Sequence, residues 1–189
     1  MRRSIRLSEI ILLVLFFGKP VAGDILLGAP ETRVEARERG LFYETRVRVA
    51  ASPEEVMDLL TDYEAIPEYL SNVDSCRVVA RTDSSTLVHQ VMTTRLILPW
   101  TFRQELEIVQ EGMGRLRFRQ VQGNVHAYRG SWELTPVVGG VEIAALGEAE
   151  HLWRLPRFVM AWILRRQVSG LLPAVVKELE RRQGMGTDR

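Results

Sequence analysis

Residues 52–73 read Ser52-Pro-Glu-Glu-Val-Met-Asp-Leu-Leu-Thr-Asp-Tyr-Glu-Ala-Ile-Pro-Glu-Tyr-Leu-Ser-Asn-Val73 and predict two short helices. Ser52 can accept a hydrogen bond from the first helical amides, and Glu55 stands where it completes a capping box. Asp62 can cap a second segment. That segment must stay short or restart at Pro67, because proline disfavours helical geometry in the residue before it.

Segments of alternating character flank this helix pair, one before it and about six after it. Residues 41–50 place Tyr43, Thr45, Val47 and Val49 on one face, and charged residues on the other. The later strands are predicted near residues 74–81, 86–95, 100–108, 115–120, 128–134 and 141–150. Short turns separate most of them, so neighbouring strands are expected to pair antiparallel.

The last part of the chain changes to helical spacing. Apolar residues recur at that spacing over residues 156–182, while Gly170 and Pro173 predict a kink or a break. A long curved sheet cannot leave one apolar face in water, and this helix is the only element long enough to cover it. The sequence therefore predicts an α+β fold: an antiparallel sheet of about seven strands wrapped on a long C-terminal helix, with two short helices after the first strand.

The chain begins with the pattern of a secretory signal peptide. Residues 1–23 combine three early arginines, an apolar run over residues 10–17, and small residues at Ala22 and Gly23. The run is shorter than the ~20 residues that a membrane-spanning helix needs, so an uncleaved membrane anchor is the weaker alternative. We expect cleavage near Gly23 and an exported, periplasmic or secreted, protein.

Removal of residues 1–23 leaves 166 residues with 21 basic and 23 acidic side chains, a net charge of about −2. That balance gives no reason to expect a nucleic-acid partner. Residues 24–40 are polar and read as a solvated lead-in or a short exposed helix, residues 41–183 as one domain, and residues 184–189 as a flexible tail. Cys76 is the only cysteine, so the chain has no intrachain disulfide.

Catalytic patterns are missing from the sequence. His89, His126 and His151 are far apart, and no nucleophile elbow or phosphate-binding glycine loop is present. We therefore predict no catalytic residue, no metal and no cofactor. Three alternating arginines could bind phosphate groups, but a solvated outer strand face paired with glutamates is the favoured interpretation; they are Arg115, Arg117 and Arg119.

Three stretches carry a resemblance to a known family: Val49-Ala-Ala-Ser-Pro-Glu-Glu-Val56, the run from Leu60-Thr-Asp-Tyr-Glu-Ala-Ile-Pro-Glu-Tyr-Leu70 to Val73-Asp-Ser-Cys-Arg-Val78, and Gly130-Ser-Trp-Glu-Leu-Thr-Pro136. Together with the element order, they resemble the START-like, or SRPBCC, superfamily, in its polyketide cyclase/dehydrase and coenzyme Q-binding branch. The resemblance implies a helix-grip fold. It also implies a cavity between sheet and helix for a lipid, an isoprenoid quinone or a polyketide-like molecule.

Candidate site residues follow from this expectation. In a helix-grip fold the core face and the pocket wall coincide, so we expect large inward side chains to line the pocket; they are Phe102, Phe118, Trp132, Phe158 and Trp162. His126, Tyr128 and His151 lie near turns or at the last strand's end and are candidates for a polar pocket rim.

Three functions remain open at this point. The leading hypothesis is an exported, non-enzymatic carrier of an apolar small molecule. The second is a cyclase or dehydratase whose acid–base group would be Tyr128, His126 or His151. The third is an interaction module that uses residues 152–162 as an amphipathic contact with a membrane or a protein. A carrier would also contact membranes transiently, and the sequence leaves the oligomeric state open.

Overall fold

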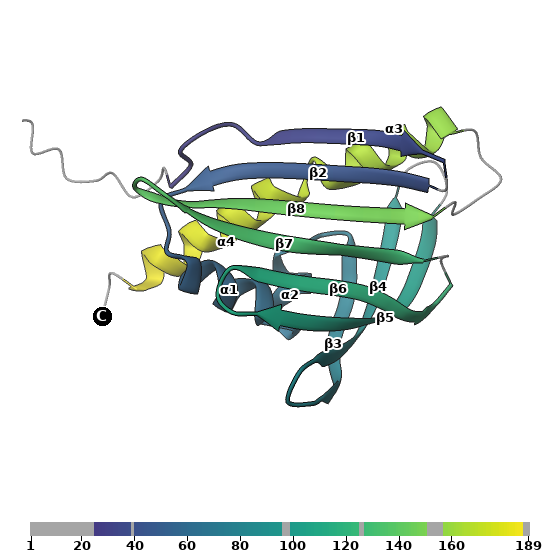
Figure 1. The fold of residues 1–189 in the computed structure, drawn as a ribbon, viewed down its shortest axis with the longest axis horizontal. Coiled ribbons are helices and arrows are strands. Elements are labelled where there is room, and N and C mark those ends of the chain that lie inside the picture. Colours follow the sequence, from purple (N-terminus) through teal and green to yellow (C-terminus); the bar gives the residue numbers. More distant parts are fainter. Residues whose placement is uncertain (1–24, 39, 96–98, 125–126, 151–156, 187–189) are drawn as a thin grey trace, which may run out of the picture.

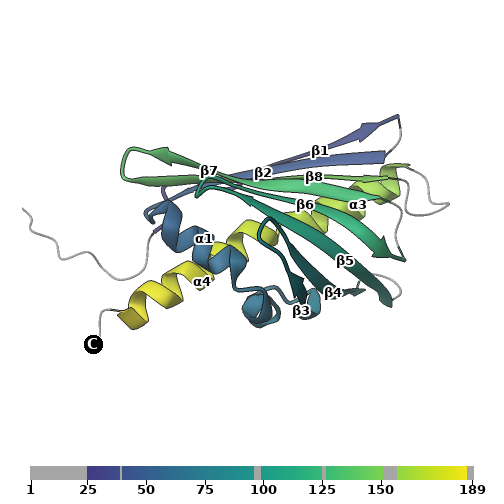
Figure 2. The same cartoon turned by 60° about the horizontal axis from the view of Figure 1, so that its bottom comes forward.

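The computed structural model describes residues 25–38, 40–95, 99–124, 127–150 and 157–186. Within these ranges eight strands form one curved antiparallel sheet, and the C-terminal helices lie against one of its faces (Figure 1, Figure 2). The strands are β1 (Glu31–Arg37), β2 (Gly40–Val49), β3 (Val73–Arg81), β4 (Thr86–Arg95), β5 (Pro99–Glu111), β6 (Arg115–Gly123), β7 (Tyr128–Val137) and β8 (Gly140–Glu150). The helices are α1 (Pro53–Thr61), the 3-10 turn η1 (Tyr63–Ala65), α2 (Ile66–Tyr69), α3 (Arg157–Val168) and α4 (Leu171–Gly186). The predicted helix-grip fold is confirmed.

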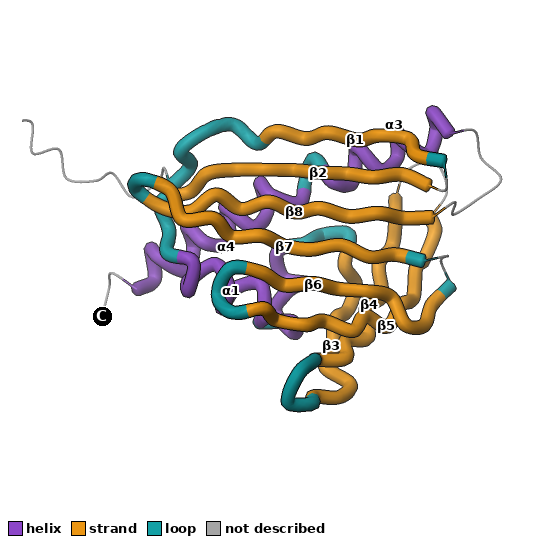
Figure 3. The backbone as a smooth tube through the Cα atoms, viewed as in Figure 1, coloured by secondary structure: helices purple, strands orange, loops and turns teal. Residues whose placement is uncertain are grey.

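The strand order is β1-β2-β8-β7-β6-β5-β4-β3 (Figure 3). The short helices after β2 carry the chain to the far edge of the sheet, where β3 begins. Successive antiparallel pairings then lead back from β3 until β8 pairs with β2. The helix pair thus decides which strands become edges and which become neighbours.

The start of α1 has the predicted capping box. The Ser52 hydroxyl accepts a hydrogen bond from the Glu55 amide at 3.1 Å, and the Glu55 carboxylate accepts one from the Ser52 amide at 2.7 Å. Asp62 differs from expectation, because its side chain makes no cap to η1 and instead binds Arg182 of α4 at 2.8 Å. The carboxylate of Asp62 therefore ties the helix pair to the C-terminal helix.

The polar stretch 24–40 contains a strand where a solvated lead-in or a short helix was expected. Residues of β1 pair in register with β2 from Glu31↔Arg46 to Arg37↔Gly40. Charged side chains occupy every second position, while Thr32, Val34 and Ala36 occupy the others. Because β1 is an edge strand packed on one face only, by α3, it needs few apolar residues, and its alternation was therefore weak.

The C-terminal helix is interrupted where Gly170 predicted a break. The helix α3 ends at Val168, and the Ser169 amide and hydroxyl both donate hydrogen bonds to the Arg165 carbonyl oxygen, at 2.9 and 2.6 Å. After the break, α4 continues to Gly186, so residues 184–186 are helical where a tail was expected. Exposed glycines weaken a helix but do not by themselves end it.

The apolar interior is divided into two clusters. The larger one joins α1 and α4 to the inner faces of β2, β7 and β8, and it includes Val56, Leu59, Ile143, Leu172 and Val175. The smaller one lies at the other side of the sheet, around Tyr63, Val73, Cys76 and Val88. The space between the two clusters is not filled by side chains, and this is where the candidate site lies.

Candidate functional site

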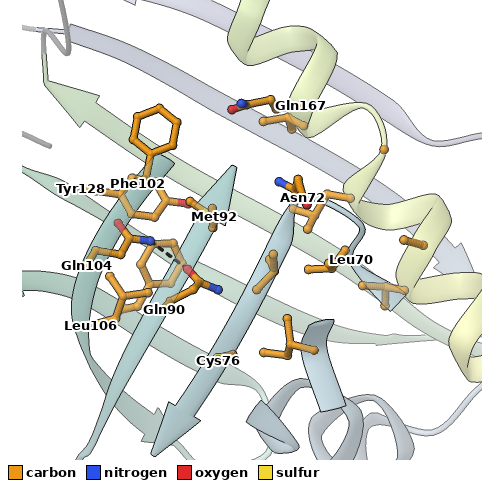
Figure 4. Close-up of a pocket in the computed structure, with 18 of the residues that line it drawn as sticks. Leu70, Asn72, Cys76, Gln90, Met92, Phe102, Gln104, Leu106, Tyr128 and Gln167 are labelled. Carbon is orange, nitrogen blue, oxygen red and sulfur yellow. Dashed lines mark hydrogen bonds between the residues drawn. The ribbon is translucent and has the colours of Figure 1, made fainter. Parts of the chain in front are cut away.

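A cavity of about 410 Å³ lies between the concave face of the sheet, the η1–α2 segment and the junction of α3 with α4 (Figure 4). Its volume falls in the range typical of small-molecule sites. Six strands, β2 and β4 to β8, contribute lining residues, together with the start of β3. The cavity thus exists because the curved sheet meets α4 closely at one end only.

Most of the lining is apolar. The strand positions that point inward carry Val88, Met92, Phe102, Leu106 and Ile108 on β4 and β5. The helices close the opposite side with aliphatic groups, namely Ile66, Leu70, Leu164, Leu171, Ala174 and Val175. Such a lining favours the transfer of an apolar molecule from water.

Two pairs of polar side chains interrupt this lining. The Gln104 amide donates a hydrogen bond of 2.8 Å to the Gln90 carbonyl oxygen, and these residues are direct partners in the β4–β5 register (Figure 4). The hydroxyls of Tyr43 on β2 and Tyr128 on β7 lie 2.7 Å apart. Gln104 is only 2% exposed to solvent, so its amide is an internal group of the domain.

The titratable groups on the cavity surface are phenols and one thiol. Burial is the main cause that raises the pKa of Tyr43, of Tyr128 and of Tyr69. Burial also raises the pKa of the Cys76 thiol to about 12. All of these groups are therefore protonated and neutral near pH 7, and none of them is a ready general base.

The strand-derived candidates and the helix-derived candidates have different positions. Phe102, Phe118, Trp132 and Tyr128 line the cavity, and the rings of Phe118 and Tyr128 lie 5.1 Å apart. Phe158 and Trp162 do not line it: their side chains are 76% and 51% exposed on the outer side of α3. The inner side of that helix presents Met160, Leu164 and Val168 instead. His126 and His151 lie outside the described residues.

Several lining residues were not singled out from the sequence. Gln90, Gln104 and Tyr43 occupy inward positions of well-alternating strands, and a polar residue at such a position is the signal that could have marked them. Cys76 also lines the cavity, at a position that a shift in the β3–β4 register turns inward. Its lack of a partner thiol had directed attention away from it.

The outer face of the sheet carries the expected ion pairs. Arg119 binds Glu107, Arg115 binds Glu133 at 3.2 Å, and Arg117 binds Glu111. These arginines are about half exposed or more, so each pair contributes little to stability. Among the described residues, no group of three or more histidine, cysteine or acidic side chains is placed to hold a metal ion.

Gly147 makes the tyrosine pair geometrically feasible. A Cβ atom at this position would lie 2.2 to 2.5 Å from three atoms of the Tyr43 side chain, so the ring rests directly on the backbone of β8. Gly147→Ala should displace that ring, separate the two hydroxyls and lower the free energy of unfolding by about 1–3 kcal/mol. Urea denaturation measures the loss. Gly114→Ala is the matched control, because its methyl group would meet no listed atom nearer than 3.6 Å. Equal stability of the two variants would contradict this account.

A curved antiparallel sheet closed over a C-terminal helix around an apolar cavity defines a helix-grip domain with a small-molecule pocket. The chain belongs to the family of polyketide cyclase / dehydrase and lipid transport proteins, whose pattern matches residues 49–176. A search of curated proteins found no significant match.

Solved structures of the same fold are similar to this chain at low sequence identity. A STAR-related lipid transfer protein from Xanthomonas axonopodis superposes with a TM-score of 0.71 at 17% identity, over 82% of this chain and 97% of that one. The Zhui aromatase/cyclase from Streptomyces sp. R1128 gives 0.64 at 14% identity, over 80% and 96% of the two chains. Human StAR-related lipid transfer protein 5 gives 0.60 at 13% identity, over 80% and 88%. At these identities the likeness establishes the fold.

Proposed function

We propose that this protein is exported and binds or carries an apolar small molecule, such as a lipid, an isoprenoid quinone or a polyketide-like compound, in the cavity between sheet and C-terminal helices. The observation that carries the proposal is the cavity itself, because about 410 Å³ of mainly apolar space remains inside the domain. Family membership supports the same class of ligand. The raised pKa values of the cavity phenols and thiol favour binding over acid–base catalysis.

The direct test is extraction and mass spectrometry of whatever co-purifies with residues 24–189 after exported expression in a bacterial host. We expect a stoichiometric apolar compound. Ala174→Phe should abolish its retention, since Ala174 lines the cavity on α4 and a phenyl ring there occupies the ligand's space. Ala80→Phe, which makes the same change at an exposed position of β3, should retain it. Equal retention by both variants would place the ligand elsewhere.

Export is proposed from residues 1–23, which lie outside the described residues. Expression of the full chain should yield a periplasmic or secreted product whose N-terminus is at or near Asp24. N-terminal sequencing of that product provides the measurement. A product that stays in the cytoplasm with residues 1–23 intact would exclude this part of the proposal.

Transient membrane contact is proposed through the outer side of α3. Phe158 and Trp162 are one helical turn apart and exposed, and Arg165 adds positive charge to the same helix. The helix Phe158–Gly184 is apolar and long enough to cross a membrane by length and composition, yet only 28% of its most apolar window is buried in the protein. Leu164 and Gln167 of the same segment line the cavity, so a membrane that contacts α3 is close to the ligand's route.

Vesicle flotation tests this contact. The protein should float with vesicles of phosphatidylglycerol and phosphatidylcholine, and Phe158→Ser with Trp162→Ser should reduce the bound fraction at least about tenfold, because two large apolar groups are lost. Val138→Ser is the control, since Val138 is 101% exposed in the β7–β8 turn at the opposite end of the sheet from α3 (Figure 1). Loss of flotation in the control, or none in the double variant, would contradict the assignment to α3.

A further inference from the structure

Two polar pairs lie on the cavity surface without contact with bulk water. Gln90 and Gln104 face each other across β4 and β5, and Tyr43 and Tyr128 meet over Gly147 of β8. All four side chains line the cavity, and Figure 4 shows Gln90, Gln104 and Tyr128 together at one side of it. Four polar side chains inside an apolar cavity are unusual enough to need an explanation, because buried polar groups are normally fully paired.

The hydrogen-bonding capacity of these pairs is not used up within the protein. The bond between the glutamines occupies one carbonyl oxygen and one N–H, which leaves a carbonyl oxygen and a free amide group on the pair. Reversal of both amides leaves the same two kinds of group. The tyrosine pair shares one hydroxyl proton and leaves a second proton to donate. Among the residues that the structure describes, none of these four side chains has another side-chain hydrogen-bond partner.

The charges around the cavity restrict what the unused groups can bind. Arg166 is the only ionised side chain among the described lining residues, and it is exposed at the α3–α4 junction. An anion placed against the glutamines would be buried without a counter-charge, which is strongly unfavourable. Burial raises the pKa of both tyrosines, so their hydroxyls stay protonated and remain donors at neutral pH.

We propose that the cavity selects an uncharged apolar ligand that carries a carbonyl or hydroxyl group, and that the Gln90–Gln104 and Tyr43–Tyr128 pairs hold this group by hydrogen bonds. Ketones, quinones, sterols and long-chain alcohols have this chemistry, whereas free fatty acids and phospholipid head groups do not. The inference rests on the proposed carrier function, because it names the ligand chemistry of the same cavity.

The test compares ligands of one chain length that differ only in the polar group. Dodecan-1-ol, 2-dodecanone and dodecanoate displace the neutral dye Nile red from the mature protein at pH 8, where the fatty acid is ionised. We expect the alcohol and the ketone to bind at least about tenfold more tightly than dodecanoate, because only they fit an uncharged polar site. Dodecanoate that binds as tightly as the alcohol would overturn the inference, whether or not Arg166→Gln weakens it.

Variants assign the preference to these residues. Gln90→Leu with Gln104→Leu removes both partners at once, so no buried amide is left unpaired. The double variant should bind dodecan-1-ol about tenfold more weakly and still bind Nile red; Tyr43→Phe with Tyr128→Phe should weaken 2-dodecanone in the same way. Gln122→Leu, at an exposed position of β6, is the control and should change neither. An unchanged preference in both double variants would overturn the inference.

The two proposals fail in different ways. If the wild-type protein binds Nile red and all three chains without preference, the carrier function stands and the inference about the polar group is wrong. If it binds none of these molecules, both are wrong. The wild-type comparison needs no variant, so it decides the question even if a double variant does not fold.

Discussion

Cys76 should react with iodoacetamide at pH 8 about a thousandfold more slowly in the folded protein than in the urea-unfolded chain. The thiolate is the reactive species, and burial raises the pKa of this thiol from 9.0 to about 12. The side chain is also only 3% exposed, beneath η1 and α2. Because Cys76 is the only cysteine, mass spectrometry of the intact chain follows the reaction directly.

A matched control is Ala80→Cys in a Cys76→Ser background, which places the thiol at an exposed position of the same strand. That thiol should be alkylated at similar rates in the folded and unfolded chain. Similar rates for Cys76 itself in the two states would contradict its assignment to the cavity surface.

The same shift has a consequence for stability at high pH. The folded state holds the Cys76 proton more tightly than the unfolded state, so this contribution is complete below pH 9 and is lost as pH rises towards 12. The tyrosines of the cavity act in the same direction, since burial raises the pKa of each. The free energy of unfolding should therefore decline above about pH 9, earlier than the surface ion pairs with arginine would require.

Leu172→Ala should lower the free energy of unfolding by about 2–5 kcal/mol, because it empties a fully packed position. Leu172 is completely buried between α4 and the sheet, within the larger apolar cluster. Leu171→Ala makes the same chemical change one residue earlier, but Leu171 lines the cavity and already borders empty space. Its loss should be clearly smaller. Urea denaturation of both variants measures the difference, and equal losses would argue that the cavity is closed in solution.

The sequence predicts strand faces well in this protein, because period-two alternation allows a single choice of inward face. Phe102, Phe118 and Trp132 could be placed on the inner face for that reason, and Gln104 lies among them on the same face. The capping box at Ser52 and the break at Gly170 were also predictable, since each depends on chemistry within one helical turn.

The helix α3 shows where this reasoning ends. Apolar residues surround it on all sides, so helical spacing alone cannot say which side faces the sheet. The contacts with β1 and β2 decide that Met160 and Val168 are buried and that Phe158 and Trp162 are not. β1 was missed for a related reason, because an edge strand with a charged outer face has too weak an apolar pattern to predict.

The place of β2 beside β8 also governs how the domain can assemble. Residues 40–49 find their partners only about one hundred positions later, at residues 141–150. Neither strand can be covered in the sheet until nearly the whole domain is available, and contacts so distant in sequence are associated with slow folding. The larger cluster, which joins α1 and α4 to these strands, must form at the same late stage. A polypeptide with this connectivity stays open to solvent for most of its synthesis, and its folding should be limited by the meeting of its two ends.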